Sequence, residues 1–122
     1  MEDKSIVSVI FGASGDLTWR KLVPALYDMY YRGLLPSGFK LLGVGRAQLT
    51  DESFREKMKE GLDRFVPASF VDQQRMGHFL EQLHYHAMDT NEAKDYEGLR
   101  RRLGELSQTA DRDDYLYYFA MP

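Results

Sequence analysis

The sequence predicts an α/β domain built on a doubly wound, mainly parallel sheet. A short apolar, β-branched run at residues 6–11 (IVSVIF) meets a glycine, as buried strands do where they end in a turn. Similar runs alternate along the chain with segments of helical periodicity. The length of 122 residues, with 43% hydrophobic and 29% charged residues, suits one globular domain. Strands that alternate with helices form right-handed crossovers, which place helices on both faces of the sheet.

The expected elements follow one another without a repeat or a linker. We expect strands at 6–11, 40–44, 84–88 and 115–121, and helices at 17–31, 51–65, 71–83 and 92–106. The apolar residues that predict the buried side of the first helix are Leu17, Leu22, Ala25, Leu26, Met29 and Tyr30, and those of the last helix are Tyr96, Leu99, Leu103 and Leu106. Pro24 removes one backbone donor and predicts a slight kink. Thr50 or Asp51 is the expected N-cap of the second helix.

Charge and composition exclude several classes of function. The formal net charge is −3 and the densest basic run is 100–102 (RRR), so we expect no binding to nucleic acid. No apolar run reaches the roughly 18 residues of a membrane span, and the N-terminus lacks the pattern of a signal peptide. The absence of cysteine excludes disulfides and thiolate metal sites. It agrees with the cytoplasmic location that we predict.

A glycine turn joins the first strand to the first helix and predicts a dinucleotide site. The pattern at 12–18 (GASGDLT) is a variant of the Rossmann-like fingerprint, in which one glycine makes the tight turn and the next lets the backbone approach a pyrophosphate. Thr18 takes the third position, where helix and strand pack closely. The free amides of the helix N-terminus then face the anion. The cofactor-binding residues predicted here are Gly12, Ala13, Ser14, Gly15, Asp16 and Leu17. The alternative is a plain strand-to-helix turn, with Ser14 or Asp16 as a cap.

The end of the second strand favours NADP over NAD. NAD-binding domains generally present an acidic residue there, but this strand runs into Gly45 and Arg46. The planar guanidinium of Arg46 can hold the 2′-phosphate of NADP, although a solvated loop arginine is the alternative.

Three further residues stand where the later strands are expected to end. Asp89 and Thr90 follow the third strand and could approach the adenine side, or they could only cap the next helix. Tyr118 lies in the fourth strand, either at the cofactor or in the core.

Three other patterns are discounted. His84 and His86 point to one face of a strand, but no third ligand is evident, so no metal site is predicted. Ser14 is not in a nucleophile elbow, because Asp16 stands where the second glycine is required. Lys21 lies one turn into the helix rather than beside a glycine, so the turn is not a P-loop.

Residues 6–36 together with 41–50 (LLGVGRAQLT) strongly resemble the N-terminal end of the glucose-6-phosphate dehydrogenase family. The resemblance is carried by the glycine turn, by Arg20, Lys21, Leu22 and Pro24, and by Gly45 and Arg46, and 118–122 (YFAMP) also fits. Thr18 and Trp19 depart from the residues that are usual in the family at these positions.

The resemblance implies that NADP is the cofactor and that glucose 6-phosphate is oxidised at carbon 1 to the lactone, as in the pentose phosphate pathway. It places residues 12–17 at the pyrophosphate, Arg46 at the 2′-phosphate, and Asp89, Thr90 and Tyr118 near the adenosine and ribose. It places Lys21 toward the nicotinamide and the sugar phosphate. The family's later histidine-containing signature does not occur in the sequence, so no general base is assigned and the chain alone is expected to be inactive.

We therefore predict that residues 1–122 form an NADP-binding domain, truncated at its C-terminal end, with the substrate domain absent. One alternative is a stand-alone nucleotide-binding or interaction module without catalysis. Another is a different NADP reductase or sugar-nucleotide epimerase, which residues 16–22 fit poorly. The apolar last strand would leave an uncovered edge, which predicts self-association.

Overall fold

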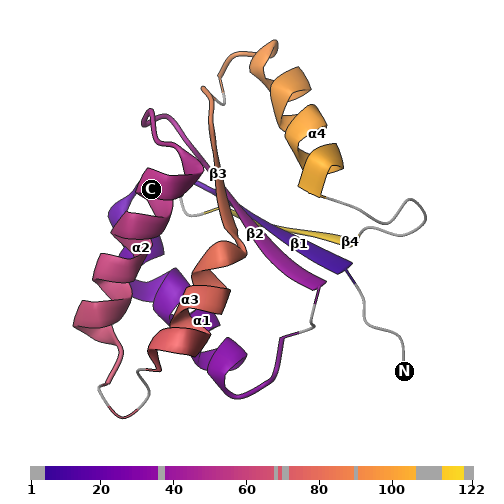
Figure 1. Ribbon diagram of the computed structural model, residues 1–122. Helices are drawn as coiled ribbons and strands as arrows, with labels where there is room; N and C mark the ends of the chain where they lie inside the picture. The colour runs from indigo at the N-terminus through magenta and orange to yellow at the C-terminus, as the bar shows by residue number, and fades with distance from the viewer. Residues whose placement is uncertain are drawn as a thin grey trace.

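The computed structural model describes residues 5–35, 38–67, 69, 72–89, 91–106 and 114–119, with the backbone alone for 5–6 and 114–119. Figure 1 shows the strands and helices of one α/β domain. In chain order the elements are β1 (Ser5–Phe11), η1 (Thr18–Leu22), α1 (Val23–Tyr31), β2 (Gly38–Gly45), α2 (Asp51–Phe65), α3 (Gln73–Glu81), β3 (Leu83–Ala87), α4 (Asp95–Leu106) and β4 (Asp114–Phe119). Each expected strand and helix is present, with bounds that differ by a few residues.

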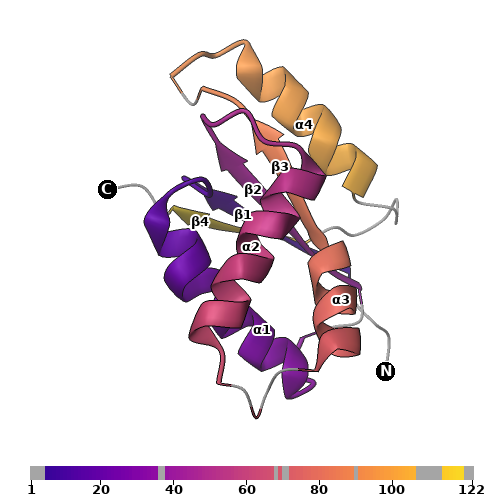
Figure 2. The ribbon, with the colours of Figure 1, turned by 60° about the vertical axis from the view of Figure 1, so that its left-hand side comes forward.

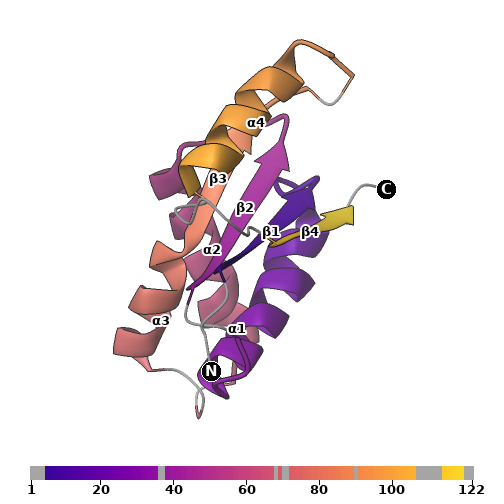
Figure 3. The same ribbon diagram turned by 90° about the vertical axis from the view of Figure 1, so that its right-hand side faces the viewer.

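The four strands form one parallel sheet in the order β3-β2-β1-β4, seen from the side in Figure 3. In the register of the sheet, Phe11 at the end of β1 lies between Val44 of β2 and Phe119 of β4. The first strand therefore has a neighbour on each side, which is the doubly wound order. The predicted fold class is confirmed.

Helices cover both faces of the sheet, as Figures 1 and 2 show. Side chains alternate along the strands, so that Val7, Val9 and Phe11 pack toward α4 while Ile10 packs toward α1 and α2. The larger core contains Val23 and Tyr27 of α1, Phe54, Met58 and Leu62 of α2, and Met76, Phe79 and Leu80 of α3. The smaller core holds Leu99 and Leu106 of α4 against Leu42 and Val44. Burial on both faces explains why the strands read as continuous apolar runs.

The first helix differs from its prediction in the residues that it buries. Its first part, η1, is one turn of π-helix, in which the N–H of Val23 donates to the carbonyl of Thr18. Pro24 follows at once and has no N–H to donate to the carbonyl four residues earlier. The kink expected at Pro24 stays a prediction. The additional residue rotates the face that follows, and Val23 and Tyr27 are fully buried. Leu17, Ala25 and Met29, which were predicted to be buried, are exposed.

Two further corrections concern α3 and α4. The helix predicted over 71–83 is shorter in the structure, because Leu83 already belongs to β3 and Asp72 caps the helix by accepting from the N–H groups of Gln74 and Arg75. In α4 the predicted stripe is buried at Leu99 and Leu106 and partly buried at Leu103, whereas Tyr96 in the first turn is 43% exposed. Residues 120 and 121, the end of the predicted last strand, lie outside the described residues.

Helix α2 approaches η1 closely. A Cβ atom at Gly61 would lie 2.5 Å from the carbonyl oxygen of Trp19, so only glycine permits this contact. The N-terminus of α2 carries a capping box, in which Thr50 accepts from the N–H of Ser53 and the Ser53 hydroxyl accepts from the N–H of Thr50. Of the two predicted caps, Thr50 is therefore the actual one.

Candidate nucleotide-binding site

The glycine turn continues from β1 and is fixed to the end of β2. Gly12 has a φ of 80°, a conformation that residues with side chains rarely adopt. The N–H groups of Gly12 and Ala13 both donate to the carbonyl of Val44, at 2.8 and 2.9 Å, and the N–H of Gly15 donates to the carbonyl of Gly12 at 3.0 Å. Thr18 is fully buried, as expected of the position where helix and strand pack closely. The turn is thus held in place by the sheet.

The structure brings the predicted phosphate ligands to one edge of the sheet. A Cβ atom at Gly45 would lie 2.7 Å from the Oγ of Ser14, so the end of β2 lies against the glycine turn, and Arg46 follows directly. Arg46 is exposed, and within the described part of the chain no acceptor binds its guanidinium. Gly15, Asp16 and Leu17 are also exposed.

Asp16 and Lys21 lie at the start of the first helix. The Asp16 carboxylate accepts from Arg20 at 2.9 Å, four residues further along the chain. Both side chains are more than half exposed, so the pair contributes little to stability. Lys21 is exposed in the π-helical turn. Its ammonium group is therefore open to solvent on the helix that follows the glycine turn.

Two residues that the sequence did not predict, one on α2 and one on β3, hold the glycine turn in place. The hydroxyl of Tyr85, on β3, donates to the carbonyl of Ala47 at 2.7 Å and also interacts with Ser14, while burial raises the pKa of the phenol. The ammonium of Lys57, on α2, donates to the carbonyl of Ser14 at 3.1 Å. We call Ser14, Ala47, Lys57 and Tyr85 the turn cluster. It joins the glycine turn to the loop that carries Arg46.

A second group of polar side chains, the edge cluster of Asp51, Arg55, His84 and Arg102, covers the outer edge of β3. The Asp51 carboxylate accepts from the N–H of Tyr85 at 2.8 Å and from Arg102, and it lies 3.4 Å from Nδ1 of His84. Arg55 donates to the carbonyl of Leu83 at 2.8 Å. The backbone groups of an edge strand are therefore satisfied by side chains, which blocks pairing with another strand.

The edge cluster shifts the pKa values of its members. Burial alone would raise the pKa of Asp51, but the hydrogen bond from the Tyr85 N–H and the contact with Arg102 outweigh it, and the pKa is lowered. Burial lowers the pKa of His84, against the opposite effect of Asp51. Burial also lowers the pKa of His86. Both histidines therefore favour the neutral form, and among the described residues no group of side chains could hold a metal ion.

The remaining predicted residues are placed only in part. The Asp89 carboxylate accepts from the N–H of Asn91 at 2.9 Å, and the N–H of Asp89 donates to Asp95 at 3.0 Å. Asp89 thus shapes the turn before α4 and does not cap that helix, which begins at Asp95. Thr90 lies outside the described residues. Tyr118 pairs through its backbone with Ile10, so it lies near the end of β4 at the same edge of the sheet as the glycine turn.

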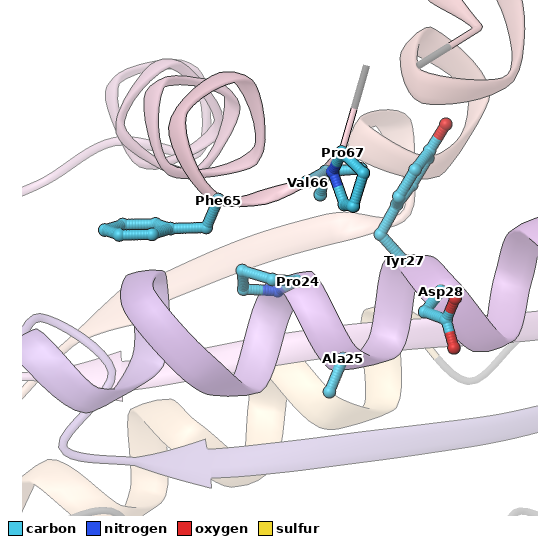
Figure 4. Close-up of a pocket in the computed structure, with 7 residues that line it drawn as sticks. All are labelled: Pro24, Ala25, Tyr27, Asp28, Phe65, Val66 and Pro67. Carbon is cyan, nitrogen blue, oxygen red and sulfur yellow. The ribbon is translucent and has the colours of Figure 1, made fainter. Parts of the chain in front are cut away.

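A pocket of 290 Å³ lies elsewhere, between α1 and the end of α2 (Figure 4). It is lined by Pro24, Ala25, Tyr27, Asp28, Phe65, Val66 and Pro67, so it shares no residue with the glycine turn.

No helix in the described ranges is long and apolar enough to cross a membrane.

A parallel sheet of this strand order, with a glycine turn at the carboxyl end of its first strand, defines a dinucleotide-binding domain of the Rossmann class. The family model described as "Glucose-6-phosphate dehydrogenase, NAD binding domain" matches residues 9–122. The chain belongs to this family and contains its coenzyme-binding domain, and the cofactor predicted from the sequence, NADP, is of the nicotinamide dinucleotide class that such a domain takes.

Similar proteins support this assignment along the whole chain. The glucose-6-phosphate 1-dehydrogenase of Aggregatibacter actinomycetemcomitans is 42% identical over 123 residues, which cover 100% of this chain and 24% of that protein. The enzyme of Treponema pallidum is 35% identical and is covered to 23%. A solved glucose-6-phosphate dehydrogenase in complex with its substrate glucose 6-phosphate superposes with a TM-score of 0.87 at 34% identity, over 98% of this chain and 25% of that one. The chain thus spans about a quarter of the length of these relatives.

Proposed function

We propose that residues 1–122 are the NADP-binding part of a glucose-6-phosphate 1-dehydrogenase. The reaction is the oxidation of glucose 6-phosphate to 6-phosphoglucono-lactone with formation of NADPH, a step of the pentose phosphate pathway. One observation carries the choice of NADP. Arg46 stands exposed and without a partner among the described residues, at the end of β2, directly beside the glycine turn.

Different residues of the site bind different parts of the cofactor. The exposed backbone of Gly15 and Asp16 at the helix N-terminus faces the pyrophosphate, together with Gly12, Ala13, Ser14 and Leu17. Arg46 holds the 2′-phosphate through its planar fork of donors. Lys21 extends toward the nicotinamide end and the sugar phosphate, and Asp89, Thr90 and Tyr118 lie toward the adenosine.

No residue of the proposed site is assigned to accept the proton that the sugar hydroxyl loses. NADP supplies the hydride acceptor when it is bound, and the sugar hydroxyl must lose its proton as the hydride leaves. The histidines in the described part of the domain, His78, His84 and His86, lie on α3 and β3 and are not part of the glycine turn. We expect the purified chain to bind NADP without reducing it in the presence of glucose 6-phosphate. A stand-alone nucleotide-binding module would show the same property. Steady formation of NADPH would contradict the expected inactivity and would exclude such a module.

Calorimetric titration of NADP and NAD into the wild-type chain and Arg46→Ala tests the cofactor. We expect the variant to bind NADP about 10–100-fold more weakly, the size of one or two hydrogen bonds between charged groups, and to bind NAD as before. Arg101→Ala, at an exposed arginine of α4, is the matched control and should change neither affinity. Equal affinity of the wild-type chain for NADP and NAD would contradict the role of Arg46.

The proposal also covers the location and the oligomeric state of the protein. For location we propose the cytoplasm, because the sequence contains no cysteine; a relative from spinach is a chloroplast protein, and cell fractionation decides between them. We propose self-association through β4, since β4 is the last strand of the described sheet and its outer side has no strand beside it there. Sedimentation over a range of concentrations would show a monomer throughout if this is wrong.

A further inference from the structure

The geometry points to Lys57 as a positioning residue for the coenzyme phosphates, an inference that rests on the proposed function. Its ammonium donates to the carbonyl of Ser14 in the glycine turn, across 43 positions of sequence. Lys57 is partly buried, and its side chain is therefore held beside the turn rather than extended into solvent.

The charge of Lys57 is not neutralised in the way that the charges of several nearby cations are. Arg20 pairs with Asp16, Lys59 pairs with Asp63, and the cations of the edge cluster lie around Asp51. Among the described residues no carboxylate lies within 4.0 Å of the Lys57 ammonium, and its partner there is a neutral carbonyl. An uncompensated positive charge next to a phosphate-binding turn favours the anion that occupies it.

The hydrogen bond also fixes the shape of the turn. The Ser14 carbonyl is held by α2, the N–H groups of Gly12 and Ala13 are held by β2, and the Tyr85 hydroxyl interacts with Ser14 from β3. Each contact reduces the number of conformations that the turn must lose when a dinucleotide binds. Lys57 therefore acts on the part of the coenzyme that NADP and NAD share, whereas Arg46 acts on the 2′-phosphate that distinguishes them.

This difference gives a selective test with Lys57→Met, Lys57→Arg and Lys59→Met in the 122-residue chain. Lys59 lies on the same helix, is exposed and is paired with Asp63, so it is the matched control. We expect Lys57→Met to weaken NADP and NAD by the same factor, about 3–10-fold, the effect of one unit charge at several ångström from a phosphate near the surface. Lys57→Arg should recover most of the affinity, and the loss in Lys57→Met should shrink as salt screens the charge. A merely structural role would lower the melting temperature without this dependence on salt.

A second measurement uses the unmutated chain, in case Lys57→Met folds poorly. The side-chain NMR signals of Lys57 should shift when NADP is added, while those of Lys59 should not. Unchanged affinity in a folded Lys57→Met, or an unshifted Lys57 signal at saturating NADP, would overturn the inference about Lys57. With normal binding by the wild-type chain and a selective loss in Arg46→Ala, the proposed function would still stand. If the wild-type chain bound neither nucleotide, both would fall together.

Discussion

The turn cluster and the edge cluster both contain side chains of α2 and β3, yet they use their polar groups differently. In the edge cluster, Asp51 accepts from the edge strand and from Arg102, and Arg55 donates to the same strand. In the turn cluster, Lys57 and Tyr85 donate to carbonyls of two loops, and no carboxylate among the described residues neutralises Lys57. The comparison indicates that the first cluster closes the edge of the sheet, while the second shapes the loops at which we propose that the coenzyme binds.

The largest effect should follow from filling the space between β2 and the glycine turn. In Gly45→Ala the added methyl would lie 2.7 Å from both Ser14 Oγ and Tyr85 Oη and 3.1 Å from the Ser14 backbone nitrogen, so the turn cluster must move. We expect a loss of about 1–3 kcal/mol in the free energy of unfolding together with weaker NADP binding. Denaturant unfolding and calorimetry measure the two. Gly77→Ala adds the same methyl on α3 where nothing lies within 4 Å, and should be neutral or stabilising; equal behaviour of the two variants would contradict a tightly packed turn.

An intermediate effect should follow from neutralising the edge cluster. Asp51→Asn weakens the contacts with Arg102 and His84, and we expect the free energy of unfolding to fall by about 1–2 kcal/mol. The NADP affinity should stay the same, because the edge cluster does not touch the glycine turn. Asp63→Asn, which breaks an exposed pair with Lys59, is the control and should cost less than about 0.5 kcal/mol. An altered NADP affinity in Asp51→Asn would remove the functional distinction between the two clusters.

The smallest effect is a dependence of stability on pH. The pKa values of His84 and His86 are lowered in the folded chain, so the unfolded chain binds more protons once the pH falls through its histidine value of about 6.5. The contribution of the two histidines to stability is complete above the pKa of the unfolded chain. It is lost as the pH falls toward their lower pKa values in the folded chain. Asp51 adds a second loss in the same direction below about pH 3.8, because its folded pKa is also lowered. Urea unfolding between pH 8 and 5 measures the first loss, and replacing both histidines by glutamine should flatten it.

Local patterns were sufficient to predict the frame of the fold and the position of the turn. The apolar run of β1, the glycine at its end and the capping residue Thr50 act within a few residues, and the structure confirms each. The buried face of the first helix was predicted only in part: Leu22, Leu26 and Tyr30 do pack against the core. A π-helical turn before Pro24 adds a residue that the periodicity does not reveal, so the fully buried residues were missed. Lys57 and Tyr85 could not be found, because their contacts with Ser14 and Ala47 exist only after α2 and β3 have packed beside the turn.

The close contact between Gly61 and the carbonyl of Trp19 also determines whether Lys57, on another turn of the same helix, can contact the glycine turn. Lys57 precedes Gly61 by four residues and therefore lies on the same side of α2. A side chain at position 61 would act as a spacer and would lift this side of the helix away from η1. The ammonium of Lys57 would then no longer reach the carbonyl of Ser14. The absence of a side chain at position 61 therefore keeps α2 close enough to hold the glycine turn.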